Sequence, residues 1–435
     1  MSRFVVMDVV FYGGSLNYDQ GAGNYQELKK ITKWDGRQYT LVSRYALRYS
    51  ILEMAKMMGL WNIADGGKLV ESGGGDKQVI QPKPELLLNG EILKYPEFDL
   101  FGYLITSTIP QASRVAPVKI SHAISLTPFY YDNQFAGNIG FAKRRLAYTG
   151  KMDINLFTIE EHYTYYVYTV VIDLDKIGEN EVYLSARDKD WEIIEFTDNS
   201  NEYILKLKGK KAKNAGLIKD EKGGELKIPR KLEIGKIEVD GKEKLVYVET
   251  RIEEIKDGST TKVYKIIQKI TPKEAKQKRI KELVKTILNL KRSIKGRDED
   301  LSPKLLVVGI YKNHPYKTYK DKIFLKDEYS EESYDEIEEK EEDGKKIVKV
   351  KHIISKSKKP VFEVVGDEFE SEPTEMSEDE IIEFISELFK DGEKTGQNIN
   401  EGEAKNEVCN EVCMVKVFYD PSVKIEVKEV KTETK

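Results

Sequence analysis

The sequence predicts an α+β fold with a ferredoxin-like core and large, mostly β insertions. Three segments rich in β-branched and aromatic residues, 4–12, 163–175 and 301–311, have the composition of buried strands. Two amphipathic helices, expected at residues 43–59 and 271–294, lie between them. This order of strand, helix, middle strands, helix and final strand is that of a ferredoxin-like core. At 435 residues the chain is long enough for two or three domain-sized units.

The first strand and the helix after it have clear local signals. Residues 4–12 are followed by Gly13 and Gly14, which favour a break in the strand. Ser43 is a suitable N-cap, because its hydroxyl can accept a hydrogen bond from a free amide of the first helical turn. We therefore expect a helix from Ser43 to Gly59, with a buried stripe formed by Leu47, Ile51, Met54 and Met58.

The middle of the chain alternates between glycine-rich and strongly β segments. The glycines of residues 64–76 predict a mobile loop or a weak hairpin. Residues 163–175 are almost continuously apolar or aromatic, which indicates a central strand. Their tyrosines invite a role in stacking single-stranded bases, but core packing explains the pattern better.

A change of character marks residues 179–270, where short alternating strands are separated by turns rich in lysine and glycine. The helix after this segment opens with a capping-box sequence, Thr-Pro-Lys-Glu, at Thr271. It is expected to run to about Ile294 and to end at Gly296.

Four parts of the chain are expected from these patterns. Residues 1–176 form the N-terminal part of the core with loop insertions, and residues 271–320 form its C-terminal part. Residues 177–270 form an inserted, mostly β subdomain, and residues 321–435 form an acidic, variable C-terminal region.

The C-terminal region has mixed signals. Its acidic run, residues 327–343, would repel phosphate and is expected to be solvated or disordered. Residues 378–390 have the pattern of a short amphipathic helix, residues 392–406 of a loop and residues 414–419 of a strand. Residues 424–435 alternate in charge and are expected to fray.

Positive charge gathers around the expected start of the first helix. Arg44 and Arg48 are four residues apart and share one edge of the helix, so together with its N-terminus they can hold successive phosphates. The preceding loop adds the side chains of Lys29, Lys30, Lys33 and Arg37. The alternative is a solvated helix with ordinary surface arginines, which composition alone favours.

Composition excludes several classes of protein. A net charge of −4 at pH 7 argues against a chain that is basic all over, but not against nucleic-acid binding by one face. No apolar run is long enough for a membrane span, and no signal peptide is recognisable. Cys409 and Cys413 lack the further Cys or His ligands of a zinc site, so we expect no metal and no other cofactor. The glycine-rich segments complete neither a P-loop nor a dinucleotide-binding motif.

Several of these stretches together resemble a known family. Residues 42–48, preceded by Leu28-Lys29-Lys30 and by Asn24, resemble the N-terminal signature of the CRISPR-associated backbone subunit of type I Cascade complexes. The resemblance is nearest to the DevR-type autoregulator branch of the RAMP superfamily, found in subtype I-B systems. Residues 98–104, followed by Arg114 and Pro117, agree with it, as do the segments at 172–178 and 301–311. It covers roughly residues 1–175 and 271–311.

The resemblance implies a hand-shaped palm with an RNA-recognition-type core and an assembly function without catalysis. Copies of the chain would stack head to tail along a guide crRNA in the cytoplasm, with other Cascade subunits, and leave the bases free to pair with target DNA. Residues that match the signature directly are Ser43, Arg44, Arg48, Lys29, Lys30 and Arg37. Arg114 is carried over from the palm strands, although such an arginine is more often a surface residue.

A second basic cluster rests on charge alone. Lys143, Arg144 and Arg145 lie within residues 135–151, which fit a hairpin that crosses the RNA and a basic surface loop equally well.

An endoribonuclease and a transcriptional regulator are the alternatives to an assembly function. Distant relatives in the superfamily cut RNA with a histidine or with a metal-binding aspartate, so an endoribonuclease acting on CRISPR RNA is the alternative. None of the histidines, His122, His162, His314 and His352, sits in a recognisable catalytic pattern, and the neighbours of Asp8 and Asp99 suggest structural roles. A transcriptional regulator would need a helix-turn-helix, and the expected helix at 43–59 lacks a paired short helix.

Overall fold

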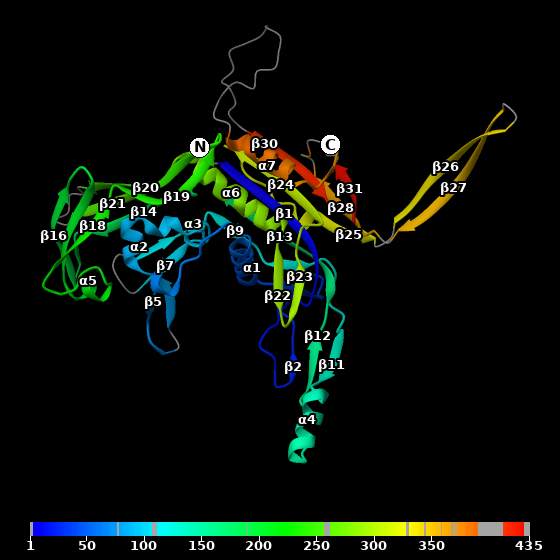
Figure 1. Cartoon of the computed structure of the whole chain (residues 1–435), viewed down its shortest axis with the longest axis horizontal. Coiled ribbons are helices and arrows are strands. Elements are labelled where there is room, and N and C mark those ends of the chain that lie inside the picture. The colour runs from blue at the N-terminus through cyan, green and yellow to red at the C-terminus, as the bar shows by residue number, and fades with distance from the viewer. Residues whose placement is uncertain are drawn as a thin grey trace, which may run out of the picture.

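The structure, a computed structural model, contains a large, mostly antiparallel sheet with arms that extend from it (Figure 1). The residues it describes are 3–75, 78–106, 111–188, 190–255, 262–327, 330–342, 345–357, 359–366, 369, 372–389 and 412–429. The loop expected at 392–406 and Cys409 lie outside them.

The first strand, β1 (Arg3–Gly14), is central in the large sheet. It pairs antiparallel with β13 (Tyr163–Asp173) and β24 (Leu305–Lys312), and β13 pairs in turn with β10 (Ala123–Ser125). The resulting order, β24-β1-β13-β10, is that of a ferredoxin-like core, and the predicted α+β class is confirmed. The sheet also includes β3 (Lys30–Thr32), β4 (Gln38–Val42), β9 (Val118–Ile120), β29 (Thr374–Glu375) and β30 (Val412–Tyr419).

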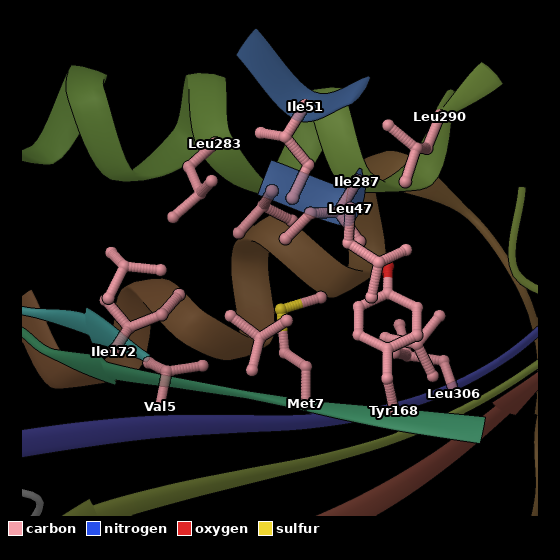
Figure 2. Packing of buried hydrophobic residues seen from close by; sticks show 14 of the residues in the cluster. Val5, Met7, Leu47, Ile51, Tyr168, Ile172, Leu283, Ile287, Leu290 and Leu306 are labelled. Atoms are coloured by element: carbon pink, nitrogen blue, oxygen red, sulfur yellow. The ribbon is translucent and has the colours of Figure 1, made fainter. Parts of the chain in front are cut away.

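One face of this sheet is covered by helices α1 (Arg44–Met57), α6 (Lys273–Leu288) and α7 (Glu378–Ser386), the last continued by a 3₁₀ turn, η5 (Glu387–Phe389). Figure 2 shows how side chains from the strands and helices meet in one core. The core includes Val5, Met7, Tyr168, Ile172 and Leu306 from the sheet and Leu47, Ile51, Leu283, Ile287 and Leu290 from the helical layer. Tyr166 and Tyr168 are fully buried, so core packing is confirmed for them.

The other face is covered by a small sheet of β25 (Ile323–Asp327), β28 (Val361–Gly366) and β31 (Lys424–Glu429). Strand β31 occupies the first part of the segment that was expected to fray. That prediction is wrong for these six residues, because each pairs with a residue of β28 in a parallel ladder.

Residues 179–270 fold into two four-stranded sheets around a second hydrophobic core. The first contains β14 (Glu179–Ser185), β19 (Lys231–Val239), β20 (Lys242–Ile255) and β21 (Val263–Thr271). The second contains β15 (Arg187–Asp188), β16 (Trp191–Asp198), β17 (Glu202–Lys208) and β18 (Gly224–Pro229), with helix α5 (Lys210–Asn214) beside it. Earlier elements extend this region or join it to the large sheet: η1 (Gly66–Lys68), β5 (Leu69–Ser72), β6 (Val79–Pro82), α2 (Pro84–Asn89), η3 (Glu91–Lys94), α3 (Pro96–Phe101), β7 (Tyr103–Ile105) and β8 (Ala112–Arg114).

Helix α6 is shorter than the sequence pattern suggests. It ends at Leu288, and the chain then forms a hairpin of β22 (Lys291–Ile294) and β23 (Arg297–Asp300). Lys295 and Gly296 both have positive φ, which is the geometry of a two-residue hairpin turn, so Gly296 closes a hairpin rather than a helix. The expected capping box is also absent, because Thr271 is held in β21 opposite Tyr247.

The acidic run is ordered into a strand, so the disorder that was one of the two expectations is wrong. The other expectation, that the run is solvated, agrees with the exposed side chains of Asp335 and Glu336. Strand β26 (Ser330–Glu342) pairs with β27 (Lys345–Ser357) in a long hairpin that projects from the body (Figure 1). The register explains the difference, since it sets Asp335 opposite His352 and Glu336 opposite Lys351.

A second arm projects near α1 (Figure 1). It consists of β11 (Asn133–Gly137), β12 (Leu156–Glu160) and, between them, helix α4 (Ile139–Thr149), with β2 (Tyr25–Gln26) paired to β12.

Asp8 is a carboxylate buried in the middle of β1. Its Oδ1 accepts a hydrogen bond from the Thr169 hydroxyl at 2.5 Å, and its Oδ2 accepts one from the Tyr319 amide at 2.6 Å. Tyr319 precedes a 3₁₀ turn, η4 (Lys320–Lys322), so Asp8 fixes the position of this turn against the sheet. Burial is the main cause that raises the pKa of Asp8, to about 6.

Asp99, at the join between the large sheet and the inserted segment, is fully buried. It forms ion pairs with Arg114 at 2.7 Å and with Arg279 of α6 at 2.6 Å, and it accepts a hydrogen bond from the Gly178 amide at 2.9 Å. One carboxylate therefore joins three segments that are far apart in sequence.

We expect Asp99→Asn to destabilise the protein strongly, because it leaves two guanidinium groups buried without a counter-charge. Breaking such a buried pair costs about 3–5 kcal/mol in the free energy of unfolding, measurable by urea denaturation. Asp19→Asn is the matched control: it removes an exposed pair with Lys29 and should cost less than about 1 kcal/mol. Equal losses in the two variants would contradict the structural role of Asp99.

The raised pKa of Asp8 predicts a pH-dependent contribution to stability. The folded state binds the proton more tightly than the unfolded state, whose pKa is near the ordinary 3.8, so stability is lost as pH rises through about 6. The loss is about 3 kcal/mol, since the pKa differs by about two units and each unit is worth about 1.4 kcal/mol. Asp8→Asn keeps an acceptor for the Tyr319 amide without the charge.

We therefore expect Asp8→Asn to unfold at higher urea than the wild type at pH 7.5, and the advantage to vanish at pH 4. Comparing the two proteins at each pH cancels the titration of all other groups. An advantage of the same size at both pH values would show that Asp8 does not titrate as expected.

Candidate nucleic-acid interface

Ser43 caps α1 as the sequence predicts. Its hydroxyl accepts a hydrogen bond from the Ala46 amide at 3.2 Å, and its own amide donates to Asn17 Oδ1 at 2.8 Å. The next amide, of Arg44, donates to His122 Nδ1 at 3.0 Å. These contacts fix the helix end at the edge of the sheet and occupy the Arg44 amide. The Ser43 hydroxyl accepts a hydrogen bond in this cap, so its O–H can still donate to a ligand.

Arg44 and Arg48 line one pocket beside this helix end. Its volume is about 300 Å³, and its other lining residues include Tyr45, Phe101 and Lys119. The Arg44 guanidinium donates to the Tyr45 hydroxyl at 3.0 Å, and the Arg48 guanidinium lies over the Phe101 ring, 5.2 Å from its centre. Within the described part of the chain, neither arginine forms an ion pair. Three cationic side chains and two aromatic rings thus line the pocket, a combination that suits an anionic ligand.

The positive surface continues from Arg44 to residues far along the chain. The pKa of His122 is lowered by burial and then by the charges of Arg44 and Lys320. The pKa of Lys33 is lowered by burial; Asp321 and Asp35 oppose the shift, and Lys320 adds to it. Lys320 is therefore close enough to both His122 and Lys33 for its charge to act on them. Sequence analysis missed it, because long-range contacts hold η4 against the sheet: the Tyr319 amide donates to Asp8, and the buried Tyr319 ring contacts Phe369.

The loop lysines differ in what they contact. Lys29 is partly exposed and pairs with exposed Asp19 at 3.3 Å, a weak pair that a phosphate can replace. Lys30 pairs with buried Glu160 at 2.6 Å and lies over the Phe129 ring. Glu160 neutralises the charge of Lys30 inside the protein, so Lys30 is not free to bind phosphate. Contrary to the prediction, Lys30 does not belong to the candidate interface.

Lys33 and Arg37 flank the turn between β3 and β4. The Lys33 ammonium lies 4.0 Å from the centre of the Tyr39 ring, and Arg37 is exposed, with its Nε 3.8 Å from Asp35 Oδ2. Both side chains remain near the surface. We call the surface formed by Arg44, Arg48, Lys320, Lys33 and Arg37 the cationic strip; Lys33 and Arg37 lie at one end of it.

Arg114 also needs correction. Its side chain is 9% exposed, and besides the ion pair with Asp99 it donates hydrogen bonds to the carbonyl oxygens of Asp99, Lys176 and Glu179. The guanidinium is fully used in holding the inserted segment against the large sheet. We therefore exclude Arg114 from the candidate interface.

Lys143, Arg144 and Arg145 are exposed on α4, at the tip of the arm formed by β11 and β12. The segment is thus a hairpin with a helix between its strands, and Arg144 lies over the Phe141 ring, 4.6 Å from its centre. Large apolar side chains are exposed along the same arm: Phe135, Ile139, Phe141, Leu146 and Tyr148. That this hairpin crosses an RNA stays a prediction.

His162 and His122 are held in ways that suit structure. Buried His162 contacts the hydroxyls of Thr40 at 2.7 Å and Thr127 at 3.3 Å. His122 accepts the Arg44 amide at Nδ1, so its neutral ring carries the proton on Nε2 and has no free basic nitrogen. Among the described residues, no group of three or more His, Cys, Asp or Glu side chains forms a metal-binding cluster.

No helix in the described segments is long and apolar enough to cross a membrane.

Three solved structures are similar to the chain at low identity. A chain of a "CRISPR RNA-guided surveillance complex" is 10% identical, with 72% of each chain covered and a TM-score of 0.33. A second, in a "CRISPR RNA-guided surveillance complex, pre-nicking", is 11% identical, with 72% of this chain and 80% of that chain covered and a TM-score of 0.35. A "Type IV-B CRISPR Complex" chain is 12% identical, with 39% and 73% covered and a TM-score of 0.22.

A comparison with curated proteins finds no match. The family described as CRISPR-associated negative auto-regulator DevR/Csa2 matches residues 5–334, about three quarters of the sequence. On this match, the chain belongs to the CRISPR-associated DevR/Csa2 family.

Proposed function

We propose that the protein is a non-catalytic backbone subunit that binds guide crRNA in a cytoplasmic, type I Cascade-like surveillance complex of subtype I-B. Membership of a CRISPR-associated family restricts the role to this defence system. The observation that carries the proposal is the pocket beside α1, which Arg44 and Arg48 line without forming an ion pair among the described residues, although the charge of Glu97 acts on Arg48.

The chemistry of the interface favours contact with the RNA backbone rather than with particular bases. Guanidinium and ammonium groups of Arg44, Arg48, Lys119, Lys320 and Lys33 recognise phosphate, which carries no sequence information. A guide bound in this way keeps its base edges free to pair with target DNA.

The arm that carries α4 fits assembly of several copies. Exposed apolar side chains at its tip, such as Phe141 and Tyr148, are costly in water and suit burial against a neighbouring molecule. Head-to-tail contact between copies would bury them and place the basic residues of α4 over the RNA between subunits. Other Cascade subunits would complete the assembly.

The described structure supports a role without catalysis over the endoribonuclease alternative. A general base needs a free acceptor nitrogen within reach of the attacked hydroxyl proton. The Nδ1 atom of His122, the histidine nearest the pocket, is occupied by the Arg44 amide.

We expect Arg44→Ala/Arg48→Ala to bind single-stranded RNA of guide length about 100-fold more weakly, since each phosphate contact is worth about a factor of ten. The slope of log affinity against log salt should flatten by about 0.7 for each lost contact. Gel-shift titrations at several salt concentrations measure both, and incubation with divalent metal should leave the RNA intact.

Arg187→Ala/Arg251→Ala is the matched control, because it removes two exposed arginines of the inserted segment. It should bind like the wild type. Equal weakening in both double variants would mean that the charge of the protein as a whole, not this pocket, attracts RNA. Cleavage of the RNA would overturn the non-catalytic role.

A further inference from the structure

Trp34 is the most exposed large hydrophobic side chain among the described residues. It lies in the turn between β3 and β4 and is 98% exposed, whereas the other two tryptophans, Trp61 and Trp191, are 3% and 5% exposed. Aromatic side chains contribute most when their large apolar area is removed from water. A tryptophan held entirely in solvent therefore suggests a ligand that covers it.

The turn that carries Trp34 is rigid. The Gly36 amide donates to the Lys33 carbonyl at 3.0 Å, and the Lys33 amide donates to the Arg37 carbonyl at 3.1 Å. Gly36 has φ +76°, a conformation that favours glycine. The backbone beneath the indole is thus fixed before any ligand binds, which lowers the entropic cost of binding.

Asp35, the acidic residue of the turn, is used inside it. Its carboxylate accepts hydrogen bonds from the Arg37 amide at 3.0 Å and from the Tyr39 hydroxyl at 2.7 Å. It therefore stabilises the turn while its charge is partly met by internal donors. Asp321 adds a second negative charge near Lys33, against the positive charges of Lys33, Arg37 and Lys320.

The surroundings of Trp34 combine aromatic rings with positive charge. Lys33 lies over Tyr39, and exposed Tyr130 is near enough to raise the pKa of Tyr39, although the hydrogen bond to Asp35 is the main cause of that shift. His122 accepts a hydrogen bond from the Arg44 amide, and the charge of Lys320 acts on both His122 and Lys33, so these groups belong to one positively charged surface. Single-stranded nucleic acid needs this combination, because cations hold its phosphates and aromatic faces stack on its bases.

We propose that Trp34 is a base-stacking contact for the single-stranded RNA, at the end of the cationic strip opposite to the Arg44 and Arg48 pocket. The inference rests on the proposed function, since it assumes that RNA follows this strip. Stacking on the indole accepts any base, because every base has a π-face, so it adds affinity without adding sequence specificity.

The test uses the intrinsic fluorescence of the full-length protein. Because Trp61 and Trp191 are buried, emission from solvent-exposed indole belongs to Trp34 and is lost in Trp34→Ala. Titration with mixed-sequence single-stranded RNA should quench this emission in the wild type. Gel shifts should show about tenfold weaker binding by Trp34→Ala, with most of the affinity kept by Trp34→Phe, which retains an aromatic face.

RNA with abasic residues is the matched ligand, because it keeps the phosphates but cannot stack. Wild type and Trp34→Ala should bind it equally, and it should leave the Trp34 emission unquenched. Equal thermal unfolding of the two proteins checks that the exposed turn tolerates the substitution.

The possible results distinguish failure of the stacking inference from failure of the proposed function. RNA binding that depends on Arg44 and Arg48 but neither quenches Trp34 nor responds to Trp34→Ala overturns the stacking inference and leaves the proposed function in place. Absence of RNA binding by the wild type overturns both. A change in oligomeric state of RNA-free Trp34→Ala, with RNA affinity intact, would assign Trp34 to a protein contact and also overturn the inference.

Discussion

The burial of β1 on both faces is the constraint on which the rest of the structure depends. Its side chains alternate between the helical layer, which takes Val5 and Met7, and the small sheet, which takes Val6 and Val10. Both layers must therefore cover the sheet completely near its middle. The surface available to a ligand is pushed to the edge, where β3 and β4 lead into α1.

The same constraint explains how a charged group in the core serves the interface. Asp8 lies between Val6 and Val10 in sequence and faces the same layer, where no solvent reaches it. Its hydrogen bond with the Tyr319 amide satisfies a buried donor and fixes the turn that carries Lys320. A residue in the centre of the sheet thus helps to hold the turn that carries Lys320.

Local signals in the sequence predicted the elements that local interactions determine. Ser43 caps α1, and residues 163–173 form a buried central strand, because the signals for both lie within a few residues. The end of α6 was missed because Ile294 fits helical periodicity, while the turn at Gly296 competes for the same residues. The order of the acidic run was missed because its opposite charges are supplied by β27, across the hairpin.

In the candidate site too, the sequence predicted what depends on neighbouring residues and missed what depends on contacts between distant segments. The sequence identified Arg44 and Arg48, whose spacing on one helix is a local property, and both line the pocket. It could not separate them from Arg114 and Lys30, because the acidic partners of those residues, Asp99 and Glu160, come from other elements of the fold. Lys320 gave no signal at all, since only long-range packing brings it to the interface.

The distribution of charge reconciles a net charge of −4 with an RNA-binding face. Eight of the 75 acidic residues lie in β26, whose register with the lysine-rich β27 brings opposite charges together within a projecting hairpin. At the edge of α1, by contrast, Arg44 and Arg48 have no ion-pair partner among the described residues. Screening limits the reach of the hairpin's carboxylates to about 8 Å at physiological salt. Local charge, rather than the net charge of the chain, therefore decides whether phosphate is attracted to this face.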